Sequence, residues 1–392
     1  MIPLMKNTFI NEYETKQALA NFIIKHDKLS MGEMCFEFEK QFAKKQGRKE
    51  AVLFNSGGSA NLAMFQALKN LGMLAEGDSV GFSALTWSTN VMPLIQMDLN
   101  PVPVDCNPET LNTMSENIEK RIEEYDLKAF FATNVLGFCG DLERIRHLCK
   151  KNMILLIEDN CEALGTVLDS NNKTGNSGIG ASFSFFVAHH MSTIEGGMVC
   201  TDDENFAEML RIVRANGWDR NLTAEQQTRL RKKYNVASEF DAKYTFYDLG
   251  YNLRPTEITG FLGITQLQYL DENIKIRGEI YAKLENILKN NDELCQINHS
   301  HIKTLSPFAF PVLCKTSKLR RVYFERFSGA GIEIRPMIAG NMQKQPFFKK
   351  YVERVYDLPG VDFIHDCGFY CGIYPEMTNS DIETIKSCLS KD

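Results

Sequence analysis

The sequence lacks the features that would place the protein in a membrane, on a nucleic acid or outside the cell. No window approaches the roughly 20 apolar residues needed to cross a bilayer. The N-terminal stretch acquires charge too early to form the apolar core of a signal peptide. With 44 basic and 50 acidic side chains the net charge is −6, so no overall positive field attracts nucleic acid or an anionic membrane. We therefore expect a cytoplasmic protein that binds neither.

Metal-binding patterns are also missing. The 11 cysteines are scattered and odd in number, which is typical of reduced thiols and not of a disulfide framework. There is no CxxC pair and no HExxH motif, and Cys367 and Cys371 have no second pair at zinc-finger spacing. We expect no structural metal.

Strand and helix patterns alternate through the first 215 residues, which predicts an α/β domain. The apolar run at 129–132 is typical of a strand buried on both faces of a parallel sheet. Residues 219–245 are polar and charge-rich, and we expect an excursion or surface loop there. A long helical pattern covers 256 to about 290, and short strands and helices follow. The predicted organisation is a large domain over residues 1–255 and a smaller C-terminal α/β domain over residues 256–392.

The first candidate site element is Gly57-Gly58-Ser59, which stands directly before a helical pattern. Free N–H groups and the helix dipole make such an N-terminus a phosphate site, and glycines let a phosphate approach the backbone. The alternative is an ordinary loop followed by an N-cap.

A second candidate is Asp159, which follows the buried strand pattern at 154–157. Ligands of open α/β sheets bind at this end of the strands. An ionised Asp159 could hold a protonated pyridine nitrogen, or it could merely cap the next helix.

The third candidate is the pair His189-His190, which lies between an aromatic strand pattern and Glu195-Gly196-Gly197. Imidazole titrates near pH 6.5, so it can take and return a proton at neutral pH. Two adjacent histidines are not both expected to be core residues, although one of them is.

These elements occur together in this order, and the chain thereby resembles the pyridoxal phosphate (PLP)-dependent sugar aminotransferases, the family sometimes named for DegT and StrS. The resemblance runs from Met31-Gly32-Glu33 to Tyr374-Pro375 and includes the marker GYNLRP at 250–255. It implies the PLP-dependent transferase fold type I, as in aspartate aminotransferase, with a large mixed-sheet domain and a smaller C-terminal α/β domain. It also implies a homodimer with shared active sites.

One departure from the family concerns its active-site lysine, which forms the Schiff base with PLP. That lysine precedes the acidic residue of the Glu-Gly-Gly segment by six positions; counting back six from Glu195 gives His189, and residues 174–231 contain no lysine. An imidazole cannot form a stable imine. The resemblance therefore narrows to the sugar 3-dehydratases of the family, in which PLP and its amine form, PMP, are held non-covalently and the histidine is the base.

The resemblance also implies which residues hold the cofactor. Trp87 would stack on the ring, although a core tryptophan is the alternative, Asp159 would pair with the pyridinium nitrogen, and Glu162 would approach the ring hydroxyl. The cofactor phosphate would bind to Gly57, Gly58, Ser59 and Ser184, joined by Asn252 from the neighbouring subunit.

The implied reaction uses L-glutamate to form PMP and then removes the 3-hydroxyl group of a nucleotide-linked 4-keto-6-deoxy sugar. The expected substrate is GDP-4-keto-6-deoxy-D-mannose, and the product is a 3,6-dideoxy-4-keto sugar. Guanidinium groups suit carboxylates and phosphates, although each candidate could instead form a surface ion pair. The candidates for these anions are Arg220, Arg254 and Arg335.

Two further patterns bear on this assignment. A second dehydratase branch carries an iron–sulfur cluster on cysteines downstream of a Gly-Trp segment, but residues 201–294 contain no cysteine, so we expect no cluster. Dehydratase relatives commonly show Gly-Asn-His where this chain has Gly372-Ile373-Tyr374, which could alter the substrate or the activity. The alternatives are an aminotransferase-like enzyme with an atypical base and a non-catalytic paralogue.

Overall fold

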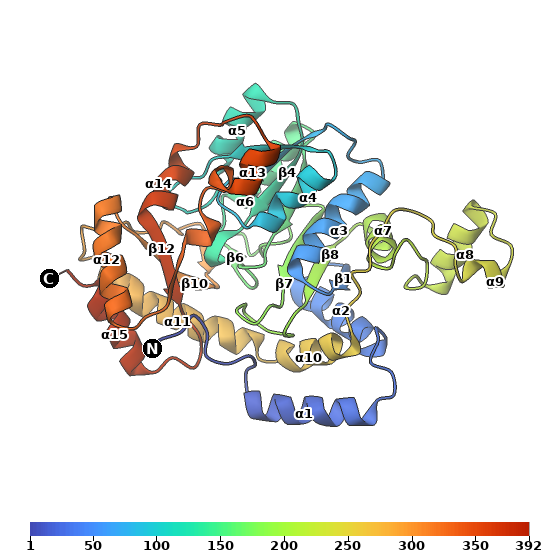
Figure 1. The fold of residues 1–392 in the computed structure, drawn as a ribbon, viewed down its shortest axis with the longest axis horizontal. Helices are drawn as coiled ribbons and strands as arrows, with labels where there is room; N and C mark the ends of the chain where they lie inside the picture. The colour runs from blue at the N-terminus through green and yellow to red at the C-terminus, as the bar shows by residue number, and fades with distance from the viewer. Residues whose placement is uncertain (392) are drawn as a thin grey trace.

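The computed structural model describes residues 1–391. A seven-stranded sheet forms its centre in the order β1-β8-β7-β5-β4-β2-β3 (Figure 1). Strand β8 is antiparallel to both of its neighbours, and the strands from β7 to β3 run parallel. The strands are β1 (Glu50–Phe54), β2 (Ser79–Ser83), β3 (Asn100–Val104), β4 (Leu127–Thr133), β5 (Leu155–Asp159), β7 (Gly180–Ser184) and β8 (Gly197–Thr201).

The sheet is buried on both faces, as the apolar runs predict. Successive side chains of a strand point to opposite faces, and the neighbours Phe130 and Phe131 of β4 are both fully buried. Phe130 belongs to an apolar cluster shared with the C-terminal part of the chain, whereas Phe131 packs edge-on against Phe65 at 5.2 Å. Two hydrophobic layers therefore hold the sheet in place.

Helices cover the sheet on both sides (Figure 1). Helix α3 begins at Gly57, directly after β1, and Asp203 caps α7 by accepting a hydrogen bond from the N–H of Phe206 over 2.9 Å. Helix α1 lies along α10, where the rings of Phe22 and Phe261 stack at 4.5 Å. The helices up to residue 215 are α1 (Glu12–Lys25), α2 (Glu33–Gln46), α3 (Gly57–Asn70), α4 (Met92–Gln96), α5 (Ser115–Glu124), α6 (Leu142–Lys151) and α7 (Glu204–Arg214).

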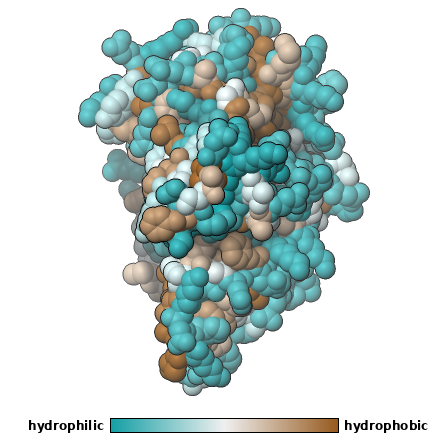
Figure 2. Space-filling model, turned by 90° about the vertical axis from the view of Figure 1, so that its right-hand side faces the viewer, coloured by the Kyte–Doolittle hydropathy of each residue, from teal (hydrophilic) through white to brown (hydrophobic). Residues whose placement is uncertain are grey.

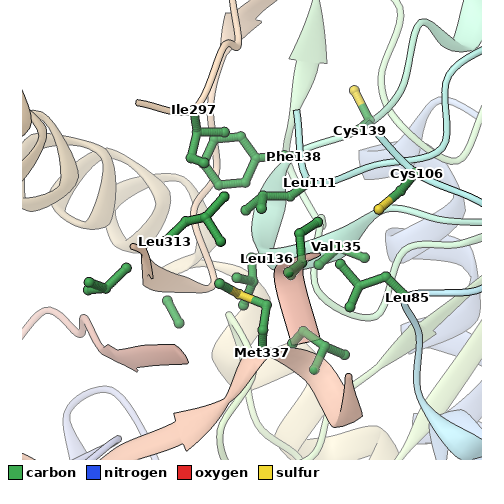
Figure 3. Close-up of a cluster of buried hydrophobic side chains, with 14 of the residues drawn as sticks. Leu85, Cys106, Leu111, Val135, Leu136, Phe138, Cys139, Ile297, Leu313 and Met337 are labelled. Carbon is green, nitrogen blue, oxygen red and sulfur yellow. The ribbon is translucent and has the colours of Figure 1, made fainter. Parts of the chain in front are cut away.

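The C-terminal part contains a three-stranded antiparallel sheet with β12 in the middle. Figure 3 shows that its side chains share one apolar cluster with the large sheet, where Met337 lies near Leu136 and Val135. The N-terminus joins this part, since Ile2 bridges Ile332. The domain division at residue 255 stays a prediction. The elements are β10 (Ala309–Leu313), β11 (Ile334–Pro336), β12 (Gly368–Gly372), α12 (Ser317–Gly329), α13 (Pro346–Tyr351), α14 (Pro359–Cys367) and α15 (Asn379–Leu389).

Short elements complete the connections. The small pair β6 (Val167–Leu168) and β9 (Ile302–Thr304) links the two parts of the chain. Single 3-10 turns are η1 (Ser88–Asn90), η2 (Val135–Gly137), η3 (Met337–Ala339) and η4 (Met342–Lys344).

The polar stretch 219–245 is an excursion, as predicted, but it is not simply a loop. It forms α8 (Ala224–Lys233) and α9 (Glu239–Ala242), which project from the body in Figure 1. The polar composition of this stretch conceals a capping box between Thr223 and Gln226 and two buried apolar residues, Leu222 and Leu230. Figure 2 looks onto this side, where separate apolar spots lie among hydrophilic side chains.

The helical pattern after residue 256 is two helices and not one. Helix α10 (Glu257–Leu267) ends where the N–H of Tyr269 bonds to the carbonyl of Gln266, a tighter turn than an α-helix makes. Helix α11 (Leu270–Leu288) then begins as a separate helix. In residues 1–391, no helix is long and apolar enough to span a membrane. The cytoplasmic location stays a prediction.

Candidate active site

The start of α3 and the end of β7 form a narrow cradle. Ser56 caps the helix, since its Oγ accepts a hydrogen bond from the N–H of Ser59 over 3.1 Å. A Cβ added to Gly57 would lie 2.7 Å from Cβ of Ser184 and 3.2 Å from Sγ of Cys161, so only glycine leaves this space open. A Cβ on the neighbouring Gly58 would meet Thr89 at 3.0 Å. The structure therefore brings Gly57, Gly58 and Ser59 at the start of α3 next to Ser184 of β7.

A buried carboxylate lies beside the cradle. Asp159, the last residue of β5, is only 5% exposed. Its Oδ2 accepts hydrogen bonds from the side-chain amides of Asn90 over 2.7 Å and Asn61 over 2.9 Å. Its Oδ1 accepts one from the N–H of Cys161 over 2.9 Å, but no α-helix begins there, so Asp159 is not a helix cap. Neither asparagine was predicted, although Asn61 lies in the first turn of the helix that follows the glycine motif.

The two histidines have different surroundings. His190 is fully buried and its Nε2 lies 3.1 Å from the carbonyl oxygen of Ser306. His189 is half-buried, its ring lies 5.2 Å from that of Phe308, and its Nδ1 has no hydrogen-bond partner in residues 1–391. Burial lowers the pKa of His189 to about 4, although the negative charge of Asp159 opposes this shift. His189 is therefore a neutral imidazole at pH 7 with a free ring nitrogen.

Glu162 faces the same region. Its Oε2 accepts a hydrogen bond from the N–H of Leu136 over 2.9 Å, and burial raises its pKa to about 8. The charge of Glu162 also acts on Tyr370, whose pKa burial raises strongly. Tyr370 stands opposite Arg335 in the register of β12 and β11. Sequence reasoning missed Tyr370, because nothing in its local pattern distinguishes it from a core aromatic residue.

Trp87 lies in the loop between β2 and η1, and its side chain is 58% exposed. The alternative of a core tryptophan is therefore wrong. Thr89, in the same turn, lies against Gly58 and within 3.4 Å of the Asn61 amide. The Trp87 loop thus borders the cradle, with its ring free to meet a ligand.

The structure does not bring every candidate to Asp159. Asn252 is exposed, and its Oδ1 accepts a hydrogen bond from Nε of Arg254 over 3.0 Å. Arg220 is also exposed and stacks on Trp218, with its guanidinium carbon 4.2 Å from the ring centroid. Their predicted roles at a shared site stay predictions.

Arg335 forms an ion pair with Glu333 at 2.5 Å, on the edge of the small sheet. In the structure Arg335 therefore forms a surface ion pair, which was the alternative to a role in binding an anionic ligand. The unusual pair Ile373 and Tyr374 is buried, at 1% and 2% exposed, so these side chains pack in the interior.

The residues fit a flat ring that carries a phosphate and a basic ring nitrogen. The cradle at Gly57 and Ser184 suits the phosphate, and Asp159 is held with one oxygen partly free. Within residues 1–391, no cluster of three or more His, Cys, Asp and Glu side chains could hold a metal ion. The eleven cysteines are all free thiols, and most of them are buried.

The mixed seven-stranded sheet is that of the PLP-dependent transferases of fold type I. The chain matches the DegT/DnrJ/EryC1/StrS aminotransferase family over residues 11–390 and belongs to this family. These comparisons confirm the expected family and fold, and they agree with the expected class of cofactor.

Sugar dehydratases are among the most similar relatives. The chain is 31% identical over 395 residues to GDP-4-keto-6-deoxy-D-mannose 3-dehydratase of Escherichia coli O55:H7, which covers 99% of each chain. It is 32% identical over 377 residues to the enzyme of that name from Yersinia pseudotuberculosis, with 94% of each chain covered. A crystal structure of GDP-4-keto-6-deoxymannose-3-dehydratase with a trapped PLP-glutamate geminal diamine superposes with a TM-score of 0.90 over all of both chains, at 31% identity.

Proposed function

We propose that the protein is a PLP-dependent 3-dehydratase of a nucleotide-linked 4-keto-6-deoxy sugar. One observation carries the proposal: a half-buried histidine, His189, with a free ring nitrogen, stands beside the cofactor cradle where the aminotransferases of the family have lysine. Support comes from the relatives named as GDP-4-keto-6-deoxy-D-mannose 3-dehydratases, and GDP-4-keto-6-deoxy-D-mannose is the proposed substrate. L-glutamate is the proposed amino donor.

The cofactor is bound non-covalently by residues of the cradle. Gly57, Gly58, Ser59 and Ser184 hold the phosphate, Asp159 holds the ring nitrogen in its protonated form, and Trp87 covers the ring. When bound, PLP or PMP supplies the electron sink, and PMP the amine that engages the keto group of the sugar. Glu162, whose carboxyl group bonds to Leu136 and acts on Tyr370, would lie at the other edge of the ring.

His189 is the proposed base that transfers the proton during removal of the 3-hydroxyl group. His189 is neutral at pH 7, because burial holds its pKa at about 4, below the value near 6.5 expected from the sequence. Its Nδ1, unpaired within residues 1–391, is the proposed proton acceptor and is a weaker base than free imidazole. The same nitrogen can return the proton to the departing 3-hydroxyl group, which leaves as water. Since His189 carries no primary amine, it forms no imine with the cofactor aldehyde and cannot displace the sugar amine from the cofactor as the lysine of an aminotransferase does. Elimination is therefore favoured over transfer of the amino group to the sugar.

The enzyme is proposed to work as a homodimer with shared sites. The partner subunit's Asn252 would complete the phosphate site, because Asn252 is exposed and available to a second chain. Arg220, Arg254 and Arg335 remain the candidates for the carboxylates of glutamate and the phosphates of the nucleotide. Arg220 and Arg335 are exposed and Arg254 is half-buried beside Asn252, positions from which each could reach an anionic ligand.

Borohydride reduction of the PLP-loaded protein, followed by peptide mapping, tests the non-covalent site. We expect no pyridoxyl-lysine, together with formation of 2-oxoglutarate when L-glutamate is added. A pyridoxyl-lysine peptide would overturn the proposal in favour of an aminotransferase-like enzyme. Protein that neither binds PLP nor yields 2-oxoglutarate would be a non-catalytic paralogue.

A further inference from the structure

A buried arginine lies behind the histidine pair and has no part in the chemistry described above. Arg277, on α11, is 3% exposed, and in residues 1–391 no carboxylate lies within ion-pair distance of it. Three hydrogen bonds hold its guanidinium, each to a neutral oxygen: Nε donates to Oδ1 of Asn273 over 2.9 Å, and Nη1 donates to the carbonyls of Phe308 over 2.8 Å and Ile373 over 2.7 Å. A buried cation without a paired carboxylate is costly, so its presence calls for a cause.

The bonded neighbours of Arg277 are the residues that touch the histidine segment. The Nδ2 of Asn273 donates a hydrogen bond to the main-chain oxygen of His190. The ring of Phe308 lies 5.2 Å from that of His189 and 6.4 Å from that of His190. Arg277 therefore joins the two surfaces between which the histidines sit, one from α11 and one from the strand segment that leads into β10.

The histidine segment also has main-chain hydrogen bonds, from the N–H of His189 to the carbonyl of Phe186 over 2.9 Å and from the N–H of Thr193 to the carbonyl of Phe185 over 2.9 Å. Residues 187–194 form turns and bends between β7 and β8, and Ile194 has a positive φ of 72°. A segment of this kind depends on side-chain hydrogen bonds to keep one conformation. The Asn273 amide supplies one such bond next to His189, and Nε2 of His190 supplies another to Ser306.

We propose that Arg277 and Asn273 form a positioning pair that sets the orientation of the His189 imidazole for proton transfer. This rests on the proposed function only in so far as His189 is the base. Asn273 holds the main chain beside the base, while Arg277 orients Asn273 and fixes Phe308 against the imidazole ring. Neither residue touches the reacting atoms.

Electrostatics supports the pair. Burial is the largest cause of the low pKa of His189; Asp159 on β5 and the backbone of Cys161 raise it, whereas the charge of Arg277 lowers it. Arg277 likewise lowers the pKa of His190, and His189 lowers that of His190 further. Burial lowers the pKa of Arg277 itself to about 10, with Glu376 opposing, so it stays a cation at neutral pH. The charge of Arg277 thus offsets that of Asp159 at the His189 imidazole.

Four variants separate position from charge. Arg277→Gln removes the positive charge. Arg277→Lys keeps the charge but loses the guanidinium group and its set of hydrogen bonds. Asn273→Ala keeps the charge of Arg277 but removes the hydrogen bond to the main-chain oxygen of His190. Arg121→Gln is the control, because Arg121 is also buried, at 9% exposed, and donates from Nε to the carbonyl of Pro103 over 3.0 Å, away from the histidines.

The first readout is the titration of His189 in cofactor-free protein with labelled histidine, followed by NMR. The His189 signal is assigned by its loss in His189→Asn. Arg277→Gln should raise the pKa of His189 by about one unit, whereas Arg277→Lys, Asn273→Ala and Arg121→Gln should leave it unchanged. If the pKa of His189 is the same in Arg277→Gln as in the unaltered protein, the claim that the charge of Arg277 acts on His189 is overturned.

The second readout is the half-reaction with L-glutamate. Arg277→Gln and Asn273→Ala should lower kcat by about 10- to 100-fold with an almost unchanged KM, whereas Arg121→Gln should leave both unchanged. A raised KM with unchanged kcat would overturn the proposal, because Arg277 would then bind the donor carboxylate. If Arg277→Gln does not fold, the kcat of Asn273→Ala decides: a value equal to that of the unaltered protein would overturn the proposal. If the unaltered protein shows no half-reaction, the proposed function fails, while the titration still tests the pair.

Discussion

The side-chain amide of Asn90 donates a hydrogen bond to Oδ2 of Asp159 over 2.7 Å. Asn61 donates to the same oxygen over 2.9 Å, and the N–H of Cys161 bonds to Oδ1. A carboxylate offers about four acceptor sites, so three are already occupied and the carboxylate has one orientation. The remaining site is what a protonated ring nitrogen would use.

Asn90→Ala should weaken PLP binding by about tenfold, because a hydrogen bond to a charged group contributes about 1.5–3 kcal/mol and Asp159 would lose its alignment. The melting temperature should fall as well, since the substitution leaves a buried carboxylate oxygen with fewer donors. An absorbance titration with PLP measures the first effect and a thermal melt the second. Asn152→Ala is the control, since Asn152 is exposed and bonds only to its own helix. Unchanged PLP affinity in Asn90→Ala would show that Asp159 does not contact the cofactor.

Gly57→Ala should abolish PLP binding without unfolding the protein. The added methyl group would lie 2.7 Å from Cβ of Ser184, so α3 or β7 must shift and the phosphate space closes. Gly329→Ala is the matched control, because Gly329 is the last residue of α12 and a Cβ there meets nothing within 4 Å. If Gly57→Ala binds PLP as tightly as Gly329→Ala, the phosphate lies elsewhere.

His189→Asn should keep PLP binding and abolish both the half-reaction with glutamate and the dehydration. Asparagine is close to histidine in size but accepts no proton near neutral pH, and one base is proposed to serve both steps. The yield of 2-oxoglutarate and the mass of the sugar product measure the two activities. Turnover retained within threefold of the unaltered protein would assign the proton to another group.

Glu162 gives a pH dependence of stability with a definite sign. Burial raises its pKa from the usual 4.5 to about 8, so the folded protein keeps a proton there that the unfolded chain releases between these values. This contribution to stability is fully present below pH 4.5 and is lost as the pH rises through 8.

Glu162→Gln removes this titration while keeping an oxygen that can accept the hydrogen bond from Leu136. The stability of Glu162→Gln relative to the unaltered apoprotein should therefore increase from pH 5 to pH 8.5, as measured by urea denaturation. A difference that stays constant across this range would mean that Glu162 is already ionised at acidic pH.

Much of the fold was predictable because it is carried by local patterns. The continuous apolar run at 129–132 lies within β4, and Gly57 starts a helix as its position before an apolar period indicates. Two helices, α8 and α9, were missed because their stability comes from a capping box and a small apolar contact that a charge-rich composition conceals.

The site was predictable only where one segment carries the signal. Gly57, Asp159 and His189 each follow or precede a recognisable strand or helix. The asparagines that orient Asp159 were not predicted, since Asn90 is 69 residues away in the chain and meets it only through the fold. The same holds for Tyr370 and for Arg277, whose hydrogen bond to the carbonyl of Ile373 spans 96 residues.

The most direct test of the central claim is the mass of the sugar product. The protein is incubated with PLP, L-glutamate and GDP-4-keto-6-deoxy-D-mannose, with the CDP-, UDP- and dTDP-linked 4-keto sugars as parallel substrates. The account predicts a GDP-linked product that has lost the 3-oxygen as water and carries no nitrogen, together with 2-oxoglutarate and ammonia. A product that retains its 3-hydroxyl group and has gained an amino group would contradict the account and assign the protein to amino-group transfer.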